Sequence, residues 1–126
     1  MRKDMGMIAD WWYEDQGSLL ELHTGYRNNI KMYLPDFTIL TNEGEYEFEE
    51  TKGWFPPKDY TKIKLALEQY DNPITLIFAN LTNCKSNRPQ YNRAMRLKPH
   101  LETKGGRLIL DAGKSIFKPI QFMFEY

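Results

Sequence analysis

The first half of the chain alternates short apolar stretches with turn-forming residues, which is typical of an antiparallel β-meander. We expect one strand over 19–26 and a return strand over 30–40, because turn residues separate them. A turn at 42–44 then precedes a third strand over 45–55. The aromatic stretch at 8–15 is compatible with a further strand or with an irregular lead-in.

The next part of the chain has one helical period and one continuous apolar run. Apolar residues recur at helical spacing over 58–70, between Pro56-Pro57 and a stop signal at 71–73. The run ITLIFA over 74–79 is typical of a strand that is covered on both faces. A strand, a helix and a buried strand in succession indicate a crossover to a parallel strand.

The remainder of the chain completes the predicted fold. A polar loop is expected first, then a short helix near 98–104 that ends at Gly105-Gly106. Residues 107–110 and 116–124 are strand candidates. The elements together predict an α/β fold with a mixed sheet. The length of 126 residues suits a single domain over 1–126 with one modest core.

Composition narrows the class of protein. The chain is 41% hydrophobic and 27% charged, which is typical of a folded globular domain. Cys84 is the single cysteine, so the chain cannot form an internal disulfide or a zinc site built on several cysteines. No apolar run approaches the roughly 20 residues that span a bilayer, and the N-terminus lacks the apolar core of a signal peptide. We therefore expect a cytoplasmic protein without a membrane partner.

The net charge is zero, but the charges are unevenly distributed. Residues 41–52 contain five glutamates and one lysine, whereas residues 80–107 contain seven basic residues and one glutamate. An acidic centre beside a basic flank is expected where metal ions bind in one place and phosphates in another. A solvated surface with accidental asymmetry is the alternative interpretation.

The predicted third strand carries the candidate chemistry. Because side chains alternate between the faces of a strand, Glu50 and Lys52 follow Phe48 on one face. A buried ion pair costs desolvation, so these charges need a reason beyond structure. The opposite face carries three glutamates that we expect to lie in solvent: Glu45, Glu47 and Glu49.

Asp36 adds a second acid on the neighbouring predicted strand. Two carboxylates that converge near a backbone carbonyl form a set of hard oxygen ligands suited to Mg²⁺. Such an ion binds a phosphate and lowers the pKa of a bound water. Lys52 on the same face could orient that water or stabilise the charge that develops at phosphorus. Asp36, Glu50 and Lys52 are therefore a minimal set for cleaving a phosphodiester.

The segment Tyr33-Leu34-Pro35-Asp36-Phe37, followed by Glu50-Thr51-Lys52-Gly53, resembles the PD-(D/E)xK nuclease superfamily. Within it, the chain is most similar to phage junction-resolving endonuclease I and TnsA-type transposase nucleases over 33–79. The resemblance implies a restriction-endonuclease-like mixed sheet flanked by helices. It also implies a Mg²⁺-dependent DNA endonuclease, with Mn²⁺ as a substitute, in a bacterial host cell if a phage encodes the chain.

The resemblance assigns roles to individual residues. Asp36 and Glu50 are expected metal ligands, the Thr51 carbonyl is a third, and Lys52 is the catalytic lysine. Trp54, beside this set, is a candidate for stacking on DNA. Five basic residues are candidate DNA contacts, with solvated loop charge as the alternative: Lys85, Arg88, Arg93, Arg96 and Lys98.

The chain departs from these families in one respect. They place a helix with a further catalytic glutamate before the first strand, and only about ten residues precede Trp11 here, fewer than a stable helix requires. Glu14, Glu21 or a partner chain could supply that acid. We expect a homodimer or a complex with such a partner. The alternative to an active enzyme is a non-catalytic DNA-binding or assembly subunit with a nuclease fold, or one half of a split nuclease.

Overall fold

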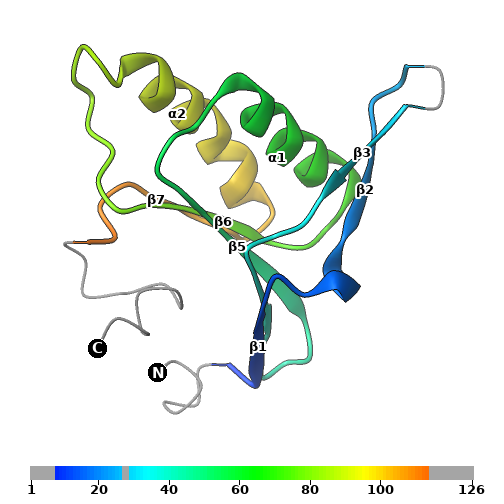
Figure 1. Cartoon of the computed structure of the whole chain (residues 1–126). Helices are drawn as coiled ribbons and strands as arrows, with labels where there is room; N and C mark the ends of the chain where they lie inside the picture. The colour runs from blue at the N-terminus through cyan, green and yellow to red at the C-terminus, as the bar shows by residue number, and fades with distance from the viewer. Residues whose placement is uncertain (1–7, 27–28, 114–126) are drawn as a thin grey trace.

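The structure is a computed structural model that describes residues 8–26 and 29–113. It has an α/β fold with a five-stranded mixed sheet in the order β1-β4-β5-β6-β7 and a separate two-stranded sheet of β2 and β3. Figure 1 shows both long helices on the same side of the large sheet. The expected α/β fold with a mixed sheet and flanking helices is confirmed at this level.

The antiparallel part of the large sheet contains β1 (Asp10–Tyr13), β4 (Phe37–Leu40) and β5 (Tyr46–Lys52). β4 lies between the other two strands and pairs antiparallel with both. The aromatic lead-in therefore forms an edge strand, and a short 3-10 helix, η1 (Gln16–Ser18), follows it.

The single return strand predicted over 30–40 is wrong. The structure divides it into β3 (Ile30–Tyr33) and β4, which belong to different sheets. Among the described residues, β3 pairs with β2 (Leu20–His23) in a hairpin and with no other strand, so the meander is not continuous. Pro35 lies at the break, where it lacks the backbone N–H that a continuing ladder would use.

The parallel part of the sheet confirms the predicted crossover. β5 leads through α1 (Pro57–Gln69) to β6 (Ile74–Phe78), which pairs parallel with β5. β7 (Leu108–Ile109) pairs parallel with β6 at the other edge. The strand predicted over 116–124 lies outside the described residues.

The predicted bounds of the polar loop and of the short helix before Gly105 are wrong. The structure has one helix, α2 (Arg88–Thr103), which begins ten residues before the predicted start at Lys98. Pro89 lies in its first turn, where no backbone N–H is needed. The predicted end is confirmed, because Gly105 adopts a φ of +89° and the Gly106 N–H donates to the Leu101 carbonyl over 2.8 Å.

The main core lies between the helices and the large sheet. It includes Phe48 and Leu76 from the sheet, Ile63 from α1 and Leu97 from α2, all nearly inaccessible to solvent. A smaller cluster of Ile8, Phe37 and Ile39 covers part of the opposite face. Neither described helix has the length and apolar character needed to cross a bilayer.

The expectation that Glu49 lies in solvent is wrong. Its side chain is buried, whereas Glu45 is exposed and Glu47 is intermediate. Glu49 lies opposite Phe37 on β4 and opposite Thr75 on β6. Phe48, Glu49 and Glu50 are all buried, so side chains cover both faces of β5 near its middle.

Candidate active site

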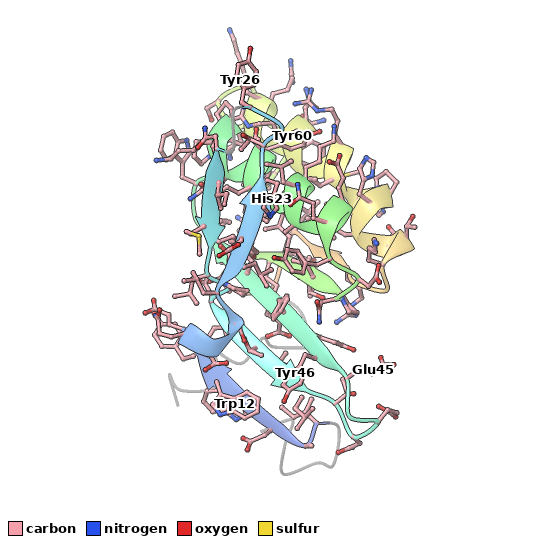
Figure 2. All side chains as sticks on the ribbon, turned by 90° about the vertical axis from the view of Figure 1, so that its right-hand side faces the viewer. Trp12, His23, Tyr26, Glu45, Tyr46 and Tyr60 are labelled. Atoms are coloured by element: carbon pink, nitrogen blue, oxygen red, sulfur yellow. The ribbon has the colours of Figure 1, made fainter. Side chains whose placement is uncertain are left out.

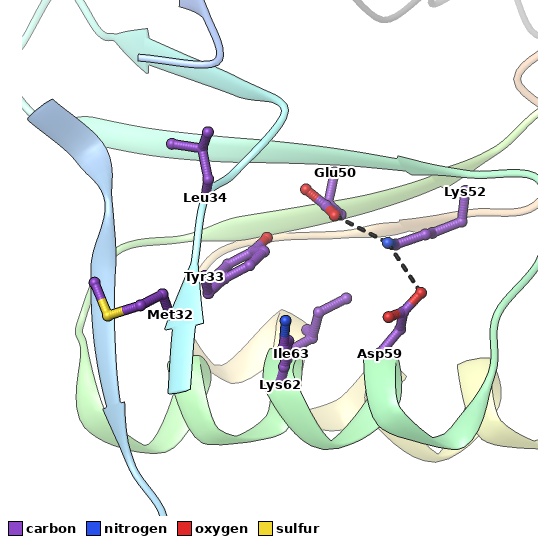
Figure 3. A pocket seen from close by; sticks show the side chains of 8 residues that line it. All are labelled: Met32, Tyr33, Leu34, Glu50, Lys52, Asp59, Lys62 and Ile63. Atoms are coloured by element: carbon purple, nitrogen blue, oxygen red, sulfur yellow. Dashed lines mark hydrogen bonds and ion pairs between the residues drawn. The ribbon is translucent and has the colours of Figure 1, made fainter. Parts of the chain in front are cut away.

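The carboxyl end of β5 places Glu50 and Lys52 on the face that α1 covers, as Figure 3 shows. The Lys52 ammonium lies 3.2 Å from Oε2 of Glu50 and 3.1 Å from Oδ2 of Asp59. Asp59 belongs to the first turn of α1. Lys52 therefore bridges a carboxylate of the strand and a carboxylate of the helix.

Asp36 reaches the same site from the start of β4. Because Phe37 lies opposite Glu49 in the antiparallel pair, Asp36 comes next to Glu50 in the register. Its backbone N–H donates to Oε1 of Glu50 over 3.0 Å. Its Oδ2 accepts from the backbone N–H and the hydroxyl of Thr51, at 2.9 and 2.7 Å. The structure thus brings together the four residues predicted for the site: Asp36, Glu50, Thr51 and Lys52.

The electrostatics of Glu50 are set by its surroundings. Burial and then the negative charge of Asp36 raise the pKa of Glu50 to about 7, although Lys52 and the Asp36 backbone N–H act in the opposite direction. A buried carboxylate of this kind is poised between its two protonation states near neutral pH. A cation bound beside it would favour the ionised form.

Lys52 remains a cation at neutral pH. Burial by itself lowers the pKa of Lys52, but the nearby carboxylates Glu50 and Asp59 outweigh it and raise that pKa above its ordinary value. In this arrangement Lys52 is a hydrogen-bond donor and a source of positive charge. It is not a base that removes a proton from water.

A cavity of about 150 Å³ opens beside these charges and gives the site its access. Tyr33 and Leu34 line it together with Glu50, Lys52 and Asp59. The Tyr33 hydroxyl is buried and has no hydrogen-bond partner among the described residues. Burial, and then the charge of Glu50, raise the pKa of Tyr33 well above its ordinary value, so the phenol stays protonated.

The sequence pattern does not predict the roles of two residues at the site. Tyr33 belongs to the motif that precedes Asp36, which gives it no role of its own. The apolar spacing of the predicted helix does not single out Asp59, a polar residue in the first turn. The available signal was that Asp59 follows Lys52 by seven residues, across a turn that returns the chain over the strand.

The site contains carboxylate oxygens of the type that bind small divalent ions. Within residues 8–26 and 29–113, no group of three or more His, Cys, Asp or Glu side chains is arranged to bind a metal. The adjacent Asp36 and Glu50 provide two hard donors, and Mg²⁺ typically takes only one or two carboxylates from a protein. The raised pKa of Glu50 is consistent with a site where added positive charge is favourable.

The two candidates for a further acid are placed differently. The Glu14 backbone N–H donates to the Asp36 carbonyl over 2.8 Å, and Glu14 adopts the left-handed backbone region with a φ of +48°. Glu21 lies exposed on the β2–β3 hairpin, where its carbonyl accepts from the Tyr70 hydroxyl. The structure therefore brings the Glu14 backbone beside Asp36, and it leaves Glu21 on the hairpin.

Four of the five predicted DNA contacts lie on α2 and not in a loop, and Lys85 precedes the helix. Arg93 donates through Nε to the Phe55 carbonyl over 2.9 Å, and the Arg96 guanidinium lies 5.3 Å from the centre of the Tyr60 ring. Arg88 and Lys98 are exposed. Arg93 and Arg96 are thus attached to the segment that leads out of the candidate active site.

Comparisons of the chain with protein-family models, with curated proteins and with solved structures find no match.

Proposed function

We propose that the protein is a Mg²⁺-dependent DNA endonuclease of the PD-(D/E)xK type, with a restriction-endonuclease-like fold. One observation carries the proposal: at the end of β5 the Glu50 carboxylate contacts both the Lys52 ammonium and the backbone N–H of Asp36, which precedes Glu50 by fourteen residues in the chain. A fold that needed only stability would gain little from burying these charges together.

Each residue has a distinct role in the proposed reaction. Asp36 and Glu50 would bind the metal with the Thr51 carbonyl, and Thr51 orients the Asp36 carboxylate through two hydrogen bonds. A Mg²⁺ ion held by these residues would supply a bound water of lowered pKa and would neutralise charge on the phosphate. Lys52 supplies positive charge to the phosphate as the transition state forms, and Glu50 and Asp59 hold its ammonium in place.

In this proposal, the basic residues of α2 and Lys85, which precedes the helix, bind the phosphates of the DNA backbone. Three of these basic residues are exposed: Lys85, Arg88 and Lys98. They do not make the contacts with the chain after β5 that Arg93 and Arg96 make. Lys98 does approach Glu102, but only at 3.9 Å and with both side chains half exposed. Contacts with phosphates would strengthen as salt is lowered.

Cleavage of DNA in different forms tests the proposal. Supercoiled plasmid, linear duplex and a branched DNA are incubated with the protein in Mg²⁺, in Mn²⁺ and in EDTA. We expect cleavage of at least one substrate in Mg²⁺ and Mn²⁺ and none in EDTA. Binding without cleavage under all three conditions would contradict an active enzyme and favour the non-catalytic subunit.

A further inference from the structure

Lys62 is a second lysine at the cavity that Lys52 lines. It belongs to α1 and borders the cavity of about 150 Å³ together with Glu50, Lys52 and Asp59. Its side chain is half-buried, and among the described residues it has no ion-pair or hydrogen-bond partner. Figure 3 shows Lys62 rising from α1, on the side of the cavity opposite to β5. The strand and the helix thus each contribute an ammonium group.

The two carboxylates at the cavity are both in contact with Lys52. Of the described residues that line the cavity, only Glu50 and Asp59 carry a negative charge, and they lie 3.2 and 3.1 Å from the Lys52 ammonium. Because an ammonium has three N–H donors, these contacts leave Lys52 with one donor and Lys62 with all three. The Tyr33 hydroxyl is a further donor without a partner among the described residues. The cavity therefore presents donors that its own carboxylates do not engage.

A phosphate group has the chemistry and the size for this cavity. Its oxygens are anionic acceptors, and the charge-assisted hydrogen bonds that lysines donate to them are among the stronger ones in proteins. Pockets that hold drug-sized ligands measure roughly 300–1,000 Å³. A cavity of about 150 Å³ suits a single small group and not a whole nucleoside.

We propose that this cavity is a phosphate-binding subsite, in which Lys62 and the third N–H of Lys52 bind the oxygens of one phosphate group. That this phosphate belongs to DNA, and is the one that is cleaved, rests on the proposed nuclease function. The proposed metal ligand Glu50 lines the same cavity, so a phosphate bound there lies beside the metal site. Lys62 is then a substrate-binding residue that α1 contributes to a site otherwise built on β4 and β5.

Binding of inorganic phosphate to the metal-free protein tests this inference without cleavage. Phosphate is titrated in EDTA at constant ionic strength, and binding is followed through the amide NMR shifts of the cavity residues. Lys62→Met removes the charge and keeps a long side chain. It should weaken phosphate binding about 10-fold or more, as expected for one lost charge-assisted hydrogen bond. Lys62→Arg should keep most of the affinity.

Lys64→Met is the matched control, because Lys64 lies on the same helix and has similar exposure. Its ammonium lies 6.0 Å from the centre of the Tyr60 ring, and its side chain does not line the cavity. This variant has the same change of charge and should bind phosphate as the wild type does. Thermal melting establishes that the three variants are folded.

Cleavage kinetics give a second readout. Lys62→Met should raise KM for DNA and change kcat little, because the contact is made in the bound substrate and in the transition state alike.

The outcomes separate the subsite from the function on which its use rests. Phosphate that does not bind the wild type, or that Lys62→Met binds as well as the wild type does, overturns the subsite. An equal loss in Lys62→Met and Lys64→Met also overturns it, since only the overall charge would then matter. Mg²⁺-dependent nicking by the wild type would still support the nuclease. Phosphate binding that depends on Lys62, without cleavage of any DNA, supports the phosphate site and contradicts the nuclease.

Discussion

Glu50 is the residue whose environment is most unusual for its type. Its side chain is only 7% exposed, it lies 3.2 Å from the Lys52 ammonium, and it accepts a hydrogen bond from the Asp36 backbone. Burial raises its pKa to about 7, so the folded protein binds a proton at Glu50 more tightly than the unfolded chain does. Glu50 should therefore contribute to the pH dependence of stability.

The first prediction is a loss of stability as the pH rises in the absence of metal. The contribution of Glu50 is fully present below its ordinary pKa of 4.5 and is lost as the pH passes through about 7. Urea denaturation in EDTA should give a free energy of unfolding lower at pH 8 than at pH 5 by up to about 3 kcal/mol. Glu50→Gln should remove this difference. A wild-type profile that is flat or rises over this range contradicts the assignment.

The second prediction separates catalysis from metal binding. Lys52→Ala should lower the cleavage rate at least about 100-fold, because the positive charge near the phosphate is lost. Mn²⁺ binding, measured by calorimetry, should persist because an ammonium is not a metal ligand. Asp59→Asn is the matched control: Lys52 keeps its contact with Glu50, so a smaller loss is expected. Equal loss of Mn²⁺ binding in Lys52→Ala would assign that residue a structural role.

For individual residues, the sequence predicts which side chains neighbouring strands bring together at the site. Alternation along β5 and the pairing with β4 are enough to group Asp36, Glu50 and Lys52. Asp59 could not be predicted in the same way, because its contact with Lys52 depends on how α1 packs on the sheet. The burial of Glu49 depends on the two neighbouring strands and on the side chains that cover its face of the sheet. The alternation of residues along β5 does not reveal either of these.

At the scale of elements, α2 is the main difference between expectation and structure. The residues that α2 buries, Ala94, Leu97 and Leu101, are spaced by three and four positions, so the helical period was present in the sequence. Pro89 and Pro99 obscured it, because proline usually marks the end of a helix. Pro89 is compatible with a first turn, and Pro99 removes one backbone hydrogen bond from a helix that packing otherwise stabilises.

The third prediction concerns the turn that follows α2. A Cβ at Gly106 would lie 1.9 Å from the Ile74 carbonyl oxygen, so the turn and the start of β6 could not keep their positions. Gly106→Ala should lower the free energy of unfolding by about 3 kcal/mol or more, measured by urea denaturation. Gly53→Ala is the control, because space is open there, and it should change stability little. A fully stable Gly106→Ala protein would contradict this packing.

At the scale of the whole molecule, exposed aromatic residues gather near the β1 edge of the large sheet. Tyr13 and Tyr46 are 61% and 50% exposed, and Trp12 is 36% exposed with its ring 6.3 Å from that of Tyr46. Figure 2 shows Trp12 and Tyr46 at the opposite end of the view from Tyr26. Exposed apolar residues that cluster beside an edge strand are typical of an interface.

The fourth prediction is that the protein forms a homodimer. Cutting both strands of a duplex or a junction requires two active sites, which a two-fold axis supplies most simply. Light scattering at micromolar concentration should give twice the mass of 15.0 kDa. Trp12→Ser should shift the protein toward the monomer if β1 forms the contact, whereas Tyr26→Ala should not. A monomer that cuts both strands efficiently would exclude the dimer.

The central claim is that Asp36 and Glu50 support metal-dependent cleavage of DNA. Asp36→Asn tests it most directly, because the amide oxygen can still accept the two hydrogen bonds from Thr51 while the negative charge is removed. The measurement is the rate at which supercoiled plasmid is nicked in Mg²⁺ by the wild-type and variant proteins, purified identically. We predict nicking by the wild type, its abolition by EDTA, and a loss of at least about 100-fold in Asp36→Asn. Equal nicking by the two proteins would contradict the proposed site.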